Sequence, residues 1–111
     1  MKPDYSIDNE VCLVTYNDSL DFEYCQRYRL IETEYLKTSH LFILDMQYVS
    51  FIDSAGIGAL ISVFRSINSR GKFLCLINLQ NNLRKVFQIS EIESLFPIFD
   101  SITEARSHFL Y

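Results

Sequence analysis

The pair Asp53-Ser54 carries the clearest chemical signal in this chain. It follows an apolar run at residues 41–45 that is typical of a buried strand. It precedes apolar residues at helical spacing, namely Ile57, Leu60, Ile61, Phe64 and Ile67. Asp and Ser are the residue types that cap the free N–H groups at a helix start. Because those N–H groups and the helix dipole also favour an anion, a serine placed here can cap the helix or carry a phosphate.

Gly56 and Gly58 lie in what we expect to be the first turns of the same helix. Each glycine costs a helix up to about 1 kcal/mol relative to alanine, so the pair needs a reason. Close packing of the helix on the sheet is one reason. Close approach of a partner's backbone at the protein surface is another, and the sequence leaves both open.

Two more carboxylates, Asp21 and Asp45, follow predicted strands, as Ser54 does. In α/β folds function gathers at the carboxyl ends of the strands, so we expect all three residues at one rim of the sheet. Simpler roles are open to each carboxylate: Asp21 can cap the helical segment from Phe22, and Asp45 can order its loop. Asp53 can cap the helix or orient the Ser54 hydroxyl. No nucleophile, base and orienting group occur together, so the sequence predicts no catalytic residue, no metal site and no cofactor.

Strand and helix patterns alternate along the chain. We expect strands at residues 5–7, 11–16, 40–44, 73–77 and 97–99, the first two forming a hairpin around Asp8-Asn9-Glu10. We expect helices over residues 22–37 and from Ala55 to near Arg70-Gly71, a third capped by Asn81-Asn82, and a fourth opened by the capping-box spacing of Ser101 and Glu104. The order ββαβαβαβα predicts an α/β fold with a mostly parallel sheet, an N-terminal antiparallel hairpin strand and about four helices.

Length, charge and composition exclude several classes of function. The chain has 111 residues, which predicts a single domain over residues 1–111. Its net charge is −4 and it has no basic run, which argues against nucleic acid and against an anionic membrane surface. Three cysteines without metal-site spacing, Cys12, Cys25 and Cys75, favour buried free thiols. No signal peptide and no membrane-length apolar run is present, so we expect a cytoplasmic protein.

Nearly the whole chain resembles the STAS domain of bacterial anti-sigma factor antagonists. The most specific part is Leu44-Asp45-Met46 followed by residues 51–58, which is similar to the family's strand, loop and Asp-Ser-small-Gly-x-Gly turn. Residues 95–105 are similar to its C-terminal strand and helix start, and Ser19-Leu20-Asp21 to its acidic loop. There are two departures: Asp18 and Glu91 stand where the family usually has Gly. Asp tolerates left-handed backbone better than most residues, so we expect the turn at Asp18 to survive.

The resemblance implies a non-enzymatic switch in transcription regulation by partner switching. In that family the serine that matches Ser54 is phosphorylated by the anti-sigma factor, a serine kinase of the GHKL ATPase type. The unmodified form binds this kinase and frees the sigma factor, and a PP2C-type phosphatase resets the switch. We expect the partner-binding residues to be Asp21, Asp53, Ser54, Ala55, Gly56 and Gly58. The alternative is an adaptor subunit of a signalling complex or transporter-associated assembly, in which Ser54 is not modified.

Overall fold

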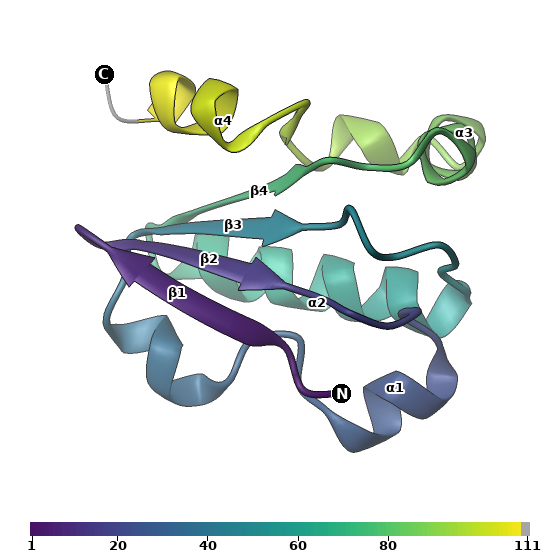
Figure 1. Ribbon diagram of the computed structural model, residues 1–111, viewed down its shortest axis with the longest axis horizontal. Helices are drawn as coiled ribbons and strands as arrows, with labels where there is room; N and C mark the ends of the chain where they lie inside the picture. Colours follow the sequence, from purple (N-terminus) through teal and green to yellow (C-terminus); the bar gives the residue numbers. More distant parts are fainter. Residues whose placement is uncertain (110–111) are drawn as a thin grey trace.

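The computed structural model describes residues 1–109 and contains one sheet with helices on both faces (Figure 1). The strands follow chain order across the sheet, the first pair antiparallel and the others parallel. They are β1 (Asp4–Asp8), β2 (Val11–Thr15), β3 (Leu41–Asp45), β4 (Phe73–Ile77) and β5 (Ile98–Phe99). The helices are α1 (Phe22–Arg27), α2 (Ser54–Ser69), α3 (Asn81–Ile89) and α4 (Ile102–Phe109), with short 3-10 helices η1 (Thr33–Lys37) and η2 (Ile92–Ser94). The expected fold class and element order are confirmed.

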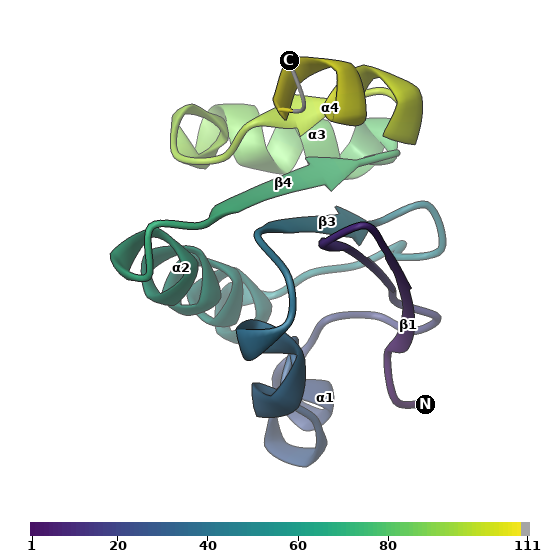
Figure 2. The same ribbon diagram turned by 90° about the vertical axis from the view of Figure 1, so that its left-hand side faces the viewer.

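The two faces of the sheet bury two hydrophobic clusters. α1 and α2 lie on one side of the sheet and α4 on the other, as the turned view shows (Figure 2). The alternation along β3 explains both clusters, because Phe42 and Leu44 join the larger cluster under α2 while Leu41 and Ile43 join the smaller one under α4. β3 is buried at every position, as expected for a central strand covered on both faces.

Local signals predicted the turns well. The β1–β2 hairpin turns through Asn9 and Glu10, which have φ values of 48° and 68°, the positive values that a two-residue hairpin turn needs. α2 ends at Ser69 and is followed by Gly71 with φ of 72°, as the stop signal predicted. Glu91 also has a positive φ, 59°, a backbone conformation that favours glycine, the residue that the resemblance led us to expect at this position.

The single helix expected over residues 22–37 is wrong. α1 ends at Arg27, Tyr28 is extended with φ of −132° and ψ of 144°, and helical structure resumes only as η1. Between α1 and η1, hydrogen bonds with two tyrosines far away in the sequence replace the backbone hydrogen bonds of a helix. The Tyr16 hydroxyl donates to the Leu30 carbonyl oxygen at 2.7 Å, and the Tyr5 hydroxyl accepts from the Glu32 N–H at 2.8 Å. The half-buried Tyr5 of β1 and the buried Tyr16 just after β2 therefore hold this segment out of the helix.

Two capping expectations need correction. α3 begins at Asn81, with Gln80 at the cap position and no side-chain cap, while the Asn82 side chain donates to the Ser50 carbonyl oxygen at 2.9 Å. At α4 the Ser101 hydroxyl accepts from the Glu104 N–H at 3.2 Å, as a capping box requires. The Glu104 carboxylate, however, accepts from the N–H of Asp100 rather than from that of Ser101.

Two of the three cysteines are the buried free thiols that the sequence predicted, and Cys25 is not fully buried. Cys12 and Cys75 are fully buried, and burial raises their pKa values to about 11 and about 12. Cys25 is half-buried. Within residues 1–109, none of the helices combines the length and the apolar character that crossing a bilayer would require.

Candidate functional site

Asp53, and not Ser54, caps α2. The Asp53 backbone is extended, and its Oδ1 accepts from the Gly56 N–H at 3.0 Å. Its Oδ2 accepts from the Phe22 N–H at 3.0 Å, which ties the start of α1 to the start of α2. The hydrogen bond from Gly56 is the largest cause that lowers the pKa of Asp53, and the bond from Phe22 adds to it. Both carboxylate oxygens are thus engaged in hydrogen bonds that order the backbone.

Ser54 is the first residue of α2 and is exposed. Its hydroxyl forms no hydrogen bond with any of the residues 1–109, so the capping role that the sequence allowed is wrong. An exposed hydroxyl at a helix N-terminus is accessible to an enzyme, and the dipole there favours the negative charge of a phosphate. With the Asp53 oxygens already engaged, the described residues give Ser54 no activating base. The arrangement suits a serine that receives a group and not one that attacks a substrate.

The two glycines of α2 have different surroundings. Gly56 is buried, and a Cβ added there would lie 2.0 Å from the Leu20 carbonyl oxygen and 2.9 Å from Cγ2 of Ile52. Close packing therefore explains Gly56. Gly58 is exposed, and a Cβ added there would have no neighbour within 4 Å. Packing inside this chain does not require a glycine at position 58, so the partner explanation stays open for Gly58.

Asp21 caps α1, because its Oδ1 accepts from the Tyr24 N–H at 2.9 Å. Asp21 directly precedes Phe22, and the Phe22 N–H donates to Asp53. Asp21 and Asp53 therefore lie where the starts of α1 and α2 meet. Asp45 has a different role. Its buried carboxylate accepts from the backbone and side chain of Gln47 and from the Asn78 side chain, at 3.1, 2.8 and 3.1 Å. Asp45 therefore orders the loops after β3 and β4, as the simpler reading of the sequence held.

The turn at Asp18 does not use left-handed backbone. We had expected that Asp18 could adopt this conformation in place of glycine. Asp18 is not among the residues with positive φ. Its Oδ1 accepts from the Ser19 N–H at 3.1 Å, and its Oδ2 lies 3.3 Å from the N-terminal amine of Met1. The extra negative charge near the site is thus paired with a positive group at the surface.

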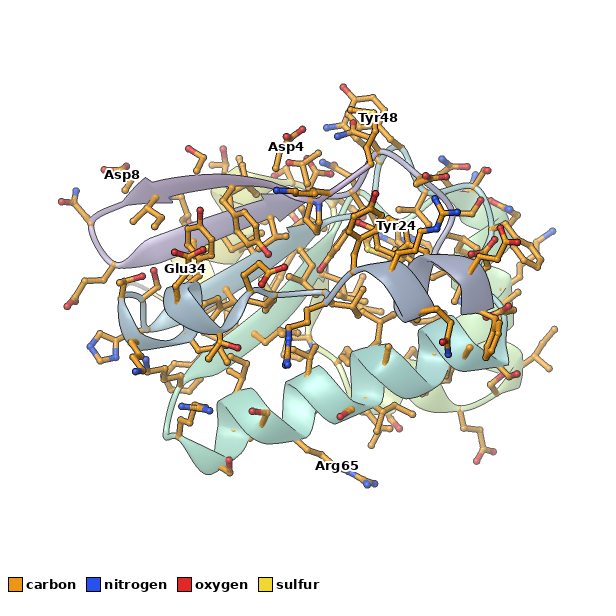
Figure 3. All side chains as sticks on the ribbon, turned by 90° about the horizontal axis from the view of Figure 1, so that it is seen from below. Asp4, Asp8, Tyr24, Glu34, Tyr48 and Arg65 are labelled. Atoms are coloured by element: carbon orange, nitrogen blue, oxygen red, sulfur yellow. The ribbon has the colours of Figure 1, made fainter. Side chains whose placement is uncertain are left out.

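Two exposed aromatic residues near the start of α2 were not predicted from the sequence. Phe22 and Phe51 keep 59% and 53% of their surface exposed, which is unusual for phenylalanine. Phe22 is bonded to Asp53, and the Phe51 carbonyl oxygen accepts from the Leu20 N–H at 3.1 Å, so both belong to the same pair of chain segments. The sequence did carry one signal for the exposure of Phe22, because this residue lies outside the apolar helical stripe formed by Tyr24 and Tyr28. A third exposed aromatic, Tyr48, projects from the loop between β3 and α2 (Figure 3).

These exposed and half-exposed residues form one surface around the starts of α1 and α2. We call it the Ser54 surface, and it consists of Asp21, Phe22, Phe51, Asp53, Ser54, Ala55 and Gly58. Aromatic residues set in a rim of charges and small residues are typical of protein interfaces. Gly56 supports this surface from beneath.

Comparisons with known proteins agree with this architecture. The family model described as STAS domain matches residues 2–105. A protein of Thermotoga maritima, named as a candidate anti-sigma factor antagonist, is 26% identical over 103 residues that cover 91% of each chain. The crystal structure of a Thermotoga maritima protein with the same description has a TM-score of 0.87 at 23% identity, covering 98% of this chain and 95% of that one.

Three other solved structures share this fold. The anti-sigma factor antagonist SpoIIAA in its unphosphorylated form has a TM-score of 0.71 at 19% identity, covering 97% of this chain and 96% of that one. The phosphorylated form of Bacillus SpoIIAA has a TM-score of 0.71 at 20% identity, covering 98% and 99%. A sulfate transporter family protein of Wolinella succinogenes has a TM-score of 0.72 at 26% identity, covering 93% and 87%.

Proposed function

The chain belongs to the STAS domain family, and from this membership and the exposed Ser54 hydroxyl we propose that it is an anti-sigma factor antagonist switched by phosphorylation at Ser54. Unphosphorylated, residues 1–111 act as a single cytoplasmic binding domain without catalytic activity. The domain sequesters an anti-sigma factor that is a serine kinase of the GHKL ATPase type, and so it regulates transcription. A PP2C-type phosphatase removes the phosphate. The names of the Thermotoga relative and of SpoIIAA support the antagonist role.

The observation that carries the proposal is the position of Ser54. It is exposed at the first residue of α2, where its hydroxyl has no structural partner among the described residues. Phosphorylation adds roughly −1.5 to −2 charge at neutral pH. The N-terminus of α2 tolerates that charge, so the fold survives the modification.

A bound partner does not tolerate the same charge. A protein packed on the Ser54 surface has to desolvate the phosphate beside the carboxylates of Asp53 and Asp21, which repel it. The exposed rings of Phe22 and Phe51 supply the apolar contact of the unmodified complex. Gly58 leaves room for the partner's backbone. Phosphorylation therefore breaks the complex and leaves the antagonist folded.

The fold likeness to the Wolinella sulfate transporter family protein favours a second candidate. In this alternative the domain is an adaptor of a transporter-associated or signalling assembly and Ser54 is not modified. The two functions differ in one measurable respect, because only the switch requires that charge at Ser54 control binding.

Labelling tests the modification directly. The protein is incubated with its candidate kinase and ATP, and the modified peptide is mapped by mass spectrometry. We expect phosphate on Ser54, no labelling of Ser54→Ala, and full labelling of Ser50→Ala, the matched control at an exposed serine four positions earlier. Full labelling of Ser54→Ala contradicts the site.

Calorimetry tests the switch. Ser54→Asp should fold at least as stably as the native chain, because a carboxylate at an exposed helix N-terminus contributes roughly 0.3–1 kcal/mol. It should bind the kinase more weakly by roughly 2–5 kcal/mol. Ser69→Asp, at the other end of α2, is the control and should bind normally. Equal affinity of Ser54→Asp and native protein favours the adaptor.

A further inference from the structure

A cleft with a volume of about 530 Å³ lies between α2 and the segment that links α1 to η1. Its walls are residues 25–31 on one side and residues 59–66 of α2 on the other, with Leu36 of η1 at one end. Figure 3 views the molecule from this side, with α1 lying across from α2. The size is within the usual range of small-molecule sites.

The cleft exists because the helix expected over residues 22–37 is broken. Tyr28 is extended after Arg27, and hydrogen bonds with Tyr16 and Tyr5 hold Leu30 and Glu32 in a non-helical path. A side effect of this path is that the N–H groups of Arg29, Leu30 and Ile31 donate to no group among residues 1–109. Hydrogen-bond donors of the main chain are thus left beside the cleft.

The side chains that line the cleft also carry hydrogen-bond donors that are free within the described residues. Arg27 and Arg29 are exposed, and neither forms an ion pair within the described part of the chain. The hydroxyls of Ser62 and Ser66 form no hydrogen bond with a described residue. No carboxylate occurs among the lining residues, although the chain as a whole has a net charge of −4. Arg27 also borders a smaller neighbouring pocket that Asp18, Asp21 and Glu23 line, whereas Arg29 does not. Within the cleft itself, two guanidinium groups among other donors and no carboxylate favour an oxyanion.

The rest of the lining is apolar. Leu30 and Ile31 are buried and Val63 of α2 is half-buried, and all three line the cleft. A ligand that satisfies both kinds of lining has an apolar body and one charged end. We propose that the cleft between the α1–η1 segment and α2 binds a small amphipathic anion, an apolar chain ending in a carboxylate or a phosphate, with Arg27 and Arg29 contacting the charged end.

This binding does not depend on the function proposed for Ser54. Ser54 does not line the cleft, whose α2 wall begins five residues later at Ala59. The ligand should therefore bind Ser54→Asp and the native protein equally, and failure of the phosphorylation proposal would leave this one standing.

Nuclear magnetic resonance titration of the ¹⁵N-labelled protein tests the site with four probes. Octanoate and octyl phosphate carry both features of the ligand, octan-1-ol lacks the charge, and inorganic phosphate lacks the apolar chain. We expect one or both octyl anions to shift the amide signals of residues 25–31 and 59–66. The stronger of the two identifies the charged end as carboxylate or phosphate. We expect octanol and inorganic phosphate each to bind at least about tenfold more weakly than that anion.

Variants locate the charged contact. Arg27→Ala/Arg29→Ala should weaken binding of the preferred anion at least about tenfold. Ser62→Glu, which adds a negative charge to the α2 wall, should weaken it too. Arg65→Ala is the matched control, because Arg65 projects from α2 away from α1 (Figure 3) and does not line the cleft. Undetectable binding of both octyl anions, shifts confined to other residues, or unchanged affinity in the double variant would overturn the proposal.

Discussion

The carboxylate of Asp53 accepts a hydrogen bond at 3.0 Å from the backbone N–H of Phe22, 31 positions earlier in the chain. Its other oxygen caps α2 through Gly56 at 3.0 Å. Leu20 and Ile52 form a parallel bridge between the same two segments. One acidic side chain thus joins the starts of α1 and α2, and it ties the backbone of Phe22 to the residue before Ser54.

Removal of the Asp53 carboxylate should loosen both helix starts. Asp53→Ala loses the cap of α2 and the acceptor for Phe22, so we expect the melting temperature to fall by several degrees and amide exchange to accelerate at Gly56 and Phe22. Asp53→Asn keeps one acceptor oxygen and should keep the cap. Hydrogen-exchange mass spectrometry with thermal unfolding measures both effects. Native-like protection at Phe22 in Asp53→Ala would contradict the link.

The same carboxylate gives stability a defined pH dependence. Hydrogen bonds lower the pKa of Asp53 below its usual value of 3.8, so its stabilising effect is complete above pH 3.8 and is lost as the pH falls through the folded-state value. Asn does not titrate. The difference in unfolding free energy between native protein and Asp53→Asn should therefore decrease below pH 3.8 and be constant above it, as measured by urea unfolding at several pH values. A difference that grows as the pH falls would reverse the sign of the argument.

Local signals predicted the element order, the hairpin turn and the stop of α2, because each depends on neighbouring residues: the period of apolar side chains, a positive φ at Asn9, a glycine after α2. The break after Arg27 could not be predicted in this way. It depends on hydroxyls of Tyr5 and Tyr16, which approach only once the sheet has formed. The cleft between this segment and α2 could not be predicted from the sequence for the same reason.

The site was predicted in place but not in detail. Asp53 and Ser54 both belong to capping residue types, and only the backbone shows that Asp53 is the extended residue before the helix. The exposure of Phe51 depends on the direction of a loop residue, which apolar periodicity does not determine. Sequence patterns located this surface, and the tertiary structure assigned the roles.

The two glycines of α2 make opposite predictions for the same substitution. Gly56→Ala places a methyl group on the Leu20 backbone, which cannot move without parting the two segments, so we expect a loss of at least about 2 kcal/mol in unfolding free energy. Gly58→Ala meets nothing within 4 Å and should stabilise the helix by up to about 1 kcal/mol. Chemical denaturation measures both. If a partner's backbone approaches Gly58, the stabilised Gly58→Ala variant should bind the kinase more weakly, and equal destabilisation of both variants would contradict the assignment.

Phe22 and Phe51 should be binding anchors without a role in stability. Because both rings are more than half exposed, alanine at either position should change the unfolding free energy by no more than about 0.5 kcal/mol. Each substitution should weaken kinase binding by about 2 kcal/mol or more, as aromatic anchors of interfaces do. Ile89→Ala is the control, because Ile89 is 84% exposed at the end of α3. Calorimetry measures the affinity of all three variants for the kinase. If Ile89→Ala loses as much affinity as the two phenylalanine variants, Phe22 and Phe51 are not specific anchors of the interface.

Cys25 should report the charge at the start of α2. Its Sγ lies 4.0 Å from the Ala55 carbonyl oxygen, and its pKa is raised above the usual 9.0 by burial first and then by the carboxylates of Asp53 and Asp21. Alkylation of Cys25 by iodoacetamide requires the thiolate, so its rate should rise through a midpoint above pH 9.0. Asp53→Asn removes a negative charge and should lower that midpoint. Ser54→Asp adds one beside Ala55 and should raise it.

The control for Cys25 is Asp18→Asn, because Asp18 is not among the charges that shift this thiol. Peptide mapping by mass spectrometry separates Cys25 from the fully buried Cys12 and Cys75, which should stay unmodified while the protein is folded. The expected order of midpoints is Asp53→Asn below native and Asp18→Asn, with Ser54→Asp above them. If Ser54→Asp leaves the midpoint unchanged while Asp53→Asn lowers it, the position-54 side chain points away from α1. A partner docked on Phe22 would then not meet the phosphate, which would contradict the charge mechanism proposed for the switch.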